Sequence, residues 1–178
     1  MNRFMHFSTI YLPPSTILVS LKRTRRDRMA QRVVDQVLEE VRKKLHVPSP
    51  SLYDAVFCVE AAYRDLDFLR KKFEERGGKR GYLLVVSPRG RMFPVCSRWE
   101  LRMTAYWAFS DRPSRDKLYE MAERFWTEGK SCPAVQRSWL CDWAVVEGVI
   151  ARIPRSAAFC DSLTKSELEW LQREKWLR

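Results

Sequence analysis

The segment that most constrains the fold is a run of five apolar residues, Tyr82-Leu83-Leu84-Val85-Val86. Their branched and aromatic side chains favour a β-strand, in which successive side chains point to opposite faces. Because every position is apolar, other parts of the chain must cover both faces of this strand. Ser87-Pro88-Arg89-Gly90 has the composition of a β-turn, and Met92-Phe93-Pro94-Val95-Cys96 follows as a second strand. We therefore predict a β-hairpin at about residues 81–96, with Pro94 at a sheet edge.

Segments with helical spacing surround this hairpin. Met29, Val33, Val37, Val41 and Leu45 recur every four residues and form an apolar stripe, which predicts a helix. Capping residues, glycines and prolines divide the rest of the chain into further helices and one short strand at 16–21. The expected fold is α+β and predominantly helical, with about six helices around a small β-hairpin or three-stranded sheet. The other five helices are expected at about 52–76, 97–109, 113–128, 133–150 and 164–178.

The length of the chain fits one domain, preceded by a basic arm. The 178 residues include 46% hydrophobic ones, which is enough for a core. Residues 1–26 contain five Lys/Arg, several Ser/Thr and no acid, a composition typical of a mitochondrial targeting segment. The alternative is a basic arm that remains on the protein. We expect a single domain at 27–178, and a location in the mitochondrial matrix or, alternatively, the cytoplasm.

The net charge of +11 is unevenly distributed along the chain. Residues 1–46 carry ten bases against four acids, and residues 70–91 carry eight against two. Positive surfaces of this kind attract nucleic acid, anionic lipid or acidic proteins. No apolar run approaches the roughly 20 residues that a membrane span requires, so no span is expected.

The residues that usually carry catalysis or bind metals are scarce. The chain has two histidines, His6 and His46, and its five cysteines include no Cys-x-x-Cys pair. The five cysteines are scattered, which favours a reducing compartment. No Asp or Glu occurs between Gly77 and Trp99, where a metal-dependent nuclease built on the hairpin would need them. We predict no enzyme activity, no metal, no cofactor and no small-molecule substrate; an enzyme with a site of ordinary carboxylates remains a third alternative.

The candidate binding residues are bases without neighbouring acids, and tryptophans of the last helix. Cations at the base and the tip of the predicted hairpin could bind successive phosphates of a nucleic-acid backbone, and the cations of the arm could do the same. The closing helix has more apolar surface than one buried face uses, and an exposed Trp there would fit a protein partner. The predicted phosphate-binding residues are Lys22, Arg23, Arg25, Arg26, Arg76, Lys79, Arg80, Arg89 and Arg91, and the predicted protein interface contains Trp170 and Trp176.

These features favour a non-enzymatic structural subunit of a large ribonucleoprotein, with a mitochondrial ribosome as the first candidate. Its partners would be RNA, ribosomal RNA in particular, and neighbouring proteins. Phosphate contacts would supply affinity without base recognition. The alternative is an accessory subunit of a protein-only mitochondrial assembly, such as a respiratory complex or ATP synthase. Its basic segments would then face acidic subunits or lipid head groups.

Overall fold

The computed structural model describes residues 3–8, 10–20, 29–61, 81–153 and 169–174 of the chain. Within these ranges lie five strands, three α-helices, one 3-10 helix and a short helical segment at 169–173, which falls within the helix expected at 164–178. The strands are β1 (Arg3–Ser8), β2 (Ile17–Val19), β3 (Val56–Ala61), β4 (Gly81–Cys96) and β5 (Arg137–Ile153). The helices are α1 (Met29–Lys44), α3 (Ser97–Phe109), α4 (Arg115–Thr127) and the 3-10 helix η2 (Ala134–Gln136).

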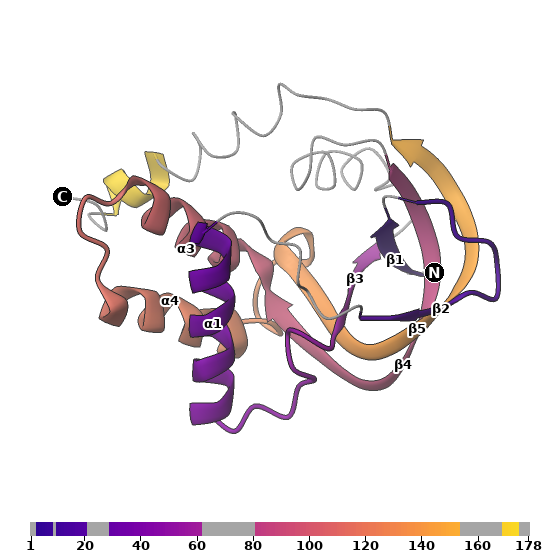
Figure 1. Cartoon of the computed structure of the whole chain (residues 1–178), viewed down its shortest axis with the longest axis horizontal. Coiled ribbons are helices and arrows are strands. Elements are labelled where there is room, and N and C mark those ends of the chain that lie inside the picture. Colours follow the sequence, from indigo (N-terminus) through magenta and orange to yellow (C-terminus); the bar gives the residue numbers. More distant parts are fainter. Residues whose placement is uncertain (1–2, 9, 21–28, 62–80, 154–168, 175–178) are drawn as a thin grey trace.

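The five strands form one antiparallel sheet that closes on itself. The order of strands is β2-β5-β3-β1-β4, and β4 also pairs with β5, so that β1, β3, β5 and β4 form a ring. β4 and β5 are long and strongly curved, and together they make a two-stranded arc around β1 and β3 (Figure 1). β2 lies outside the ring and pairs with β5 alone among the described residues.

Strand β4 is continuous where the sequence predicts a hairpin, and the predicted turn at Ser87–Gly90 is wrong. β4 runs for 16 residues and pairs with β5 along its whole length, from Gly81↔Ile153 to Cys96↔Arg137. Its pairing with β1 ends at Val86. Among the described residues, β4 therefore has a strand neighbour on one side only at Pro88 and Pro94, and on the other side their missing N–H groups cost no ladder hydrogen bond.

Two helices expected from the sequence are strands. The segment expected as a helix at 133–150 forms the short η2 and then β5, and Val56–Ala61, expected within a helix, is β3. The remainder of the predicted helix at 52–76 lies outside the described residues. The prediction of a predominantly helical chain with about six helices is therefore wrong, because the sheet has five strands and the two longest contain 16 and 17 residues.

The predictions of α1, α3, α4 and the short strand β2 are confirmed. Strands β1 and β2 both lie within the first 26 residues, for which the sequence predicts a basic arm. This segment therefore contributes two strands to the sheet.

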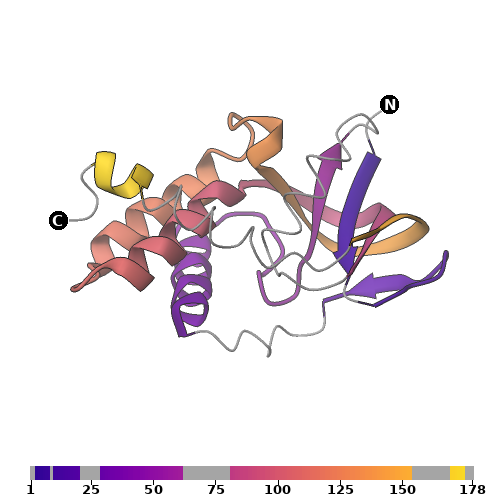
Figure 2. The same ribbon diagram turned by 90° about the horizontal axis from the view of Figure 1, so that it is seen from above.

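The helices pack against one end of the sheet, and the molecule has two apolar cores. Figures 1 and 2 show α1, α3 and α4 gathered on one side of the curved strands. The larger core joins these helices to the ends of β4 and β5, with Phe125 and Trp126 of α4 among its buried side chains. The smaller core is built by strand residues, including Cys58, Leu84, Val86 and Cys141. In the described part of the chain, no helix has the length and apolarity needed to cross a bilayer.

Candidate functional site

Of the predicted phosphate-binding residues, the structure describes only Arg89 and Arg91. Both lie in the middle of β4, at an irregularity in its pairing with β5. Between the pairs Arg89↔Trp143 and Met92↔Cys141, β4 advances by three residues and β5 by two, which defines a β-bulge. The other predicted phosphate-binding residues, Lys22, Arg23, Arg25, Arg26, Arg76, Lys79 and Arg80, lie outside the described residues.

Asp142 of β5 neutralises Arg91 at this bulge. The Arg91 Nη2 lies 2.9 Å from Asp142 Oδ1, and the Arg91 backbone N–H donates to Asp142 Oδ2 at 2.7 Å. The hydrogen bonds from Arg91 lower the pKa of Asp142 below its ordinary value, so the carboxylate is charged at neutral pH. The Arg89 side chain is exposed and has no ion pair among the described residues. Of the two predicted phosphate-binding residues at the bulge, Arg89 is thus the one that is exposed without an ion pair to a described residue.

Gly90 lets the bulge form, because its backbone has a φ of 75°. We expect Gly90→Ala to lower the free energy of unfolding by about 1–2 kcal/mol, since an L residue is strained at this φ. A Cβ added at Gly90 would also lie 2.5 Å from Asp142 Oδ2. Urea denaturation measures the change.

Gly148→Ala on β5 is the matched control for Gly90→Ala. A Cβ at Gly148 has no neighbour within 4 Å, and its φ lies outside the left-handed region, so we expect a change within about 0.5 kcal/mol. Equal stability of the two variants would contradict the role of Gly90 in the bulge.

An exposed apolar strip lies beside Arg89 on the same side of the sheet. Trp143 of β5 stands directly opposite Arg89 of β4 and Val19 of β2, so the three side chains share one face. Ile17, two residues before Val19, lies on this face too. Ile17 is 61% exposed, Val19 59% and Trp143 37%. We call Ile17, Val19, Arg89 and Trp143 the outer sheet face; it combines an aromatic ring, two aliphatic side chains and one cation.

Trp170, predicted to contact a protein partner, packs against the protein's own helix α3. Its ring meets that of Trp99 edge-on, with centroids 5.7 Å apart. The guanidinium carbon of the buried Arg102 lies 3.4 Å from the Trp170 centroid and 4.5 Å from that of Trp99. The neighbouring Leu171 has no exposed surface and belongs to the larger core. A contact between Trp170 and a partner stays a prediction, and Trp176 lies outside the described residues.

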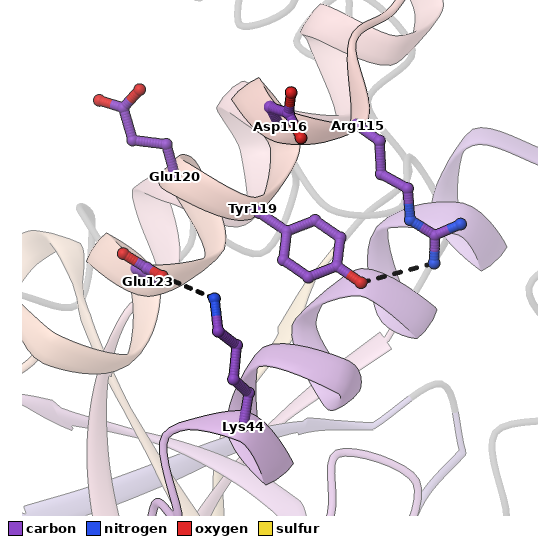
Figure 3. Close-up of a pocket in the computed structure, with 6 residues that line it drawn as sticks. All are labelled: Lys44, Arg115, Asp116, Tyr119, Glu120 and Glu123. Carbon is purple, nitrogen blue, oxygen red and sulfur yellow. Dashed lines mark hydrogen bonds and ion pairs between the residues drawn. The ribbon is translucent and has the colours of Figure 1, made fainter.

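A shallow depression between α1 and α4 collects charged side chains (Figure 3). It has a volume of about 490 Å³ and is lined by Lys44, Arg115, Asp116, Tyr119, Glu120 and Glu123. Lys44 Nζ lies 3.8 Å from Glu123 Oε1, and Arg115 Nη2 lies 2.7 Å from Oε2 of Glu40 on α1. Three acids and two bases line it, so it offers no surplus of positive charge to a phosphate.

Glu40 ties α1 to α4 at the edge of this depression. Hydrogen bonds from Tyr119 and Arg115 lower its pKa from 4.5 to about 2. A carboxylate held in this way is an acceptor that stays ionised, which is the opposite of what a general acid or base needs near neutral pH. The lining residues include no histidine, serine or cysteine. We interpret the depression as a structural contact between two helices.

Four of the cysteines form two pairs in space, which the sequence does not reveal. Cys58 and Cys141 place their Sγ atoms 3.9 Å apart in the smaller core. Cys96 and Cys132 are within hydrogen-bonding reach of one another in the larger core, and burial, followed by this hydrogen bond, raises the pKa of Cys96 to about 12. The described residues contain no cluster of three or more His, Cys, Asp or Glu that could hold a metal ion.

Comparison with known proteins adds no family assignment. No protein-family model matches this chain, and no curated protein is significantly similar to it in sequence.

Proposed function

We propose that the protein is a non-enzymatic structural subunit of a ribonucleoprotein, with a mitochondrial ribosome as the specific candidate. The distribution of charge supports this proposal. The described residues contain 17 Lys/Arg and 15 Asp/Glu, whereas the remaining residues contain 16 Lys/Arg and 7 Asp/Glu. About nine of the eleven excess positive charges thus belong to residues outside the described ranges. Such a concentration of bases favours a polyanionic partner.

Within the described part, many bases already have partners of their own. Arg91, Arg115 and Lys44 each form an ion pair with an acid of another element. RNA phosphates would therefore be bound mainly by the basic residues at 22–26 and 76–80, with Arg89 as an additional contact. On the outer sheet face, a base of a single-stranded RNA could stack on Trp143 while Arg89 binds its phosphate.

The alternative, a subunit of a protein-only mitochondrial assembly, is favoured by one observation. Ile17 and Val19 expose most of their apolar side chains next to Trp143, and aliphatic surface of this kind fits a protein neighbour better than a phosphate backbone.

Strand β1 restricts where a mitochondrial targeting segment could be cleaved. A targeting segment cleaved near residue 26 would remove β1, which pairs with both β3 and β4. We therefore propose that residues 3–19 remain in the mature protein and that any import signal within them is retained.

RNA binding is expected to weaken steeply with salt. If four to six phosphates are neutralised, the logarithm of the association constant falls with that of the salt concentration with a slope of about −3 to −5. Between roughly 50 and 200 mM salt, this amounts to a loss of affinity of about 60-fold to 1,000-fold. Fluorescence anisotropy with a labelled mixed-sequence single-stranded RNA of about 30 nucleotides measures the slope.

Two variants connect this slope to particular residues. Replacing Lys22, Arg23, Arg25 and Arg26 together by Gln should make the slope smaller by about 3, at about 0.7–0.9 per lost phosphate contact. Arg115→Gln, which removes a base already paired with Glu40, should leave the slope unchanged. A flat salt response of the unmodified protein would contradict the RNA proposal.

Sedimentation of the native protein with and without RNase then distinguishes the two assemblies, since only a ribonucleoprotein subunit shifts to lighter fractions.

A further inference from the structure

The thiols of Cys58 and Cys141 meet across one of the two shortest ladders of the ring, the other being β1–β3. β3 and β5 are joined by three register pairs, Val56↔Cys141, Phe57↔Leu140 and Cys58↔Trp139. By contrast, β4 and β5 stay paired from Gly81↔Ile153 to Cys96↔Arg137. The ring of strands is therefore held at this side by few backbone hydrogen bonds, and the two thiols stand within those few residues.

The two thiols lie close together on one face of the sheet. Cys58 and Cys141 are diagonal neighbours in the antiparallel pair, offset by two residues on one face of the sheet. Both have no exposed surface, and their Sγ atoms are 3.9 Å apart. A disulfide requires about 2.05 Å between the sulfurs and Cα atoms within about 7 Å of one another. Diagonal neighbours stand about 7–8 Å apart, so the bond requires a small shift of β3 against β5 as well as the approach of the two sulfurs.

We propose that Cys58 and Cys141 form a disulfide that locks β3 to β5 and keeps the ring of strands closed. The co-reactant is a small disulfide of the glutathione type. One thiolate attacks this disulfide and releases one thiol, and the second thiolate then attacks the mixed disulfide and releases another. The protein loses two hydrogens and two electrons, and one molecule of the small disulfide is reduced to two thiols.

Burial determines when this reaction takes place. The hydrogen bond between the two thiols raises the pKa of Cys58 and lowers that of Cys141, so the shift by itself does not prevent attack. Neither side chain has exposed surface, however, so a small disulfide cannot reach either sulfur in the folded chain. The bond therefore forms while the chain folds and the two thiols are still accessible. Once formed, the disulfide is shielded by the same burial from the thiols of the reducing compartment that the scattered cysteines favour.

The test is refolding of the full chain, with Cys160 replaced by Ser in all samples to remove the thiol outside the described residues. The denatured, reduced protein is refolded with oxidised and reduced glutathione, blocked with N-ethylmaleimide after denaturation, and digested. We expect one peptide pair linked through Cys58 and Cys141. The Tm of the oxidised protein should exceed that of the protein refolded with a reductant by roughly 5–10 °C.

Three cysteine variants complete the test. Cys58→Ala and Cys141→Ala should each lose the linked peptide and the difference in Tm between the two conditions. Cys132→Ala, the control at another buried cysteine, should keep the linked peptide and a difference in Tm. Recovery of Cys58 and Cys141 as blocked free thiols in the folded, oxidised sample would overturn the proposal, and this measurement requires no variant. A linked peptide without a rise in Tm would overturn the role of the bond in closing the ring.

Discussion

Removal of residues 1–20 is expected to abolish cooperative unfolding of the remaining chain. These residues include β1, which pairs with β3 on one side and with β4 on the other. Without β1, the facing edges of β3 and β4 lose their hydrogen bonds and the ring of strands is open. The fully buried side chain of Met5 is also lost. Circular dichroism followed through a thermal scan should show no sigmoidal transition for the truncated protein.

A point substitution tests the same strand in the full-length chain. Met5→Asp buries an unpaired carboxylate and should lower the free energy of unfolding by about 3–5 kcal/mol. Ile10→Asp, at a position 62% exposed just after β1, is the control and should change it by less than about 0.5 kcal/mol. A cooperative transition of the truncated protein at the temperature of the full-length protein would contradict an integral β1. It would also make cleavage of a targeting segment compatible with the fold.

The helices could be predicted where the apolar spacing distinguishes a helix from a strand. In α1, Val33 and Val34, then Val37 and Leu38, recur as neighbouring pairs every four residues, and a strand cannot place both members of such a pair on one face. The structure shows Val34, Val37, Leu38 and Val41 buried together. This pattern is specific to a helix, and α1 lies where the pattern predicts it.

In β5, the apolar spacing does not distinguish a strand from a helix. Trp139 and Trp143 are four residues apart, which is close to one helical turn but also an even number, so a strand places them on one face as well. In the structure, Leu140, Ala144 and Val146 are buried, and the Trp143 and Glu147 side chains are exposed. The high content of Val, Ile and Trp in this segment favoured a strand and was the available signal.

The prediction of a hairpin at 81–96 is wrong for a different reason. Pro88-Arg89-Gly90 has the composition of a turn, but it lies beside Trp143 and Asp142 of β5, a strand that follows about 50 residues later. The left-handed Gly90 serves a bulge here, which bends β4 without reversing its direction. Tertiary pairing with β5 determined the outcome, and nothing within the segment itself indicates it.

The candidate site shows the same limit. The sequence identified Arg89 and Arg91 as bases without acids nearby in the chain, yet Asp142, 51 residues after Arg91, neutralises one of them. The contact between Cys58 and Cys141 joins positions 83 residues apart and depends equally on the closure of the sheet. Local sequence could find the basic segments, but not which of their charges the folded chain would pair.

Trp126 connects the helical layer to the sheet through three different contacts. Its indole Nε1 donates to the backbone carbonyl of Leu38 in α1 at 2.8 Å. Its ring packs against Phe125 of its own helix, with centroids 4.9 Å apart, and against Phe93 of β4, at 6.1 Å. The side chain is 2% exposed. Elements α1, α4 and β4 therefore all depend on this residue for part of the larger core.

Trp126→Ala should lower the free energy of unfolding by about 3–5 kcal/mol, because it removes a large buried ring and leaves a cavity between the three elements. Trp126→Phe keeps part of the ring but loses the donor to Leu38, so a smaller loss of about 1–2 kcal/mol is expected. Phe109→Ala, at an aromatic side chain that is 47% exposed, is the control and should cost less than about 1 kcal/mol. Urea denaturation that ranks the three variants in any other order would show that Trp126 does not join the helices to the sheet.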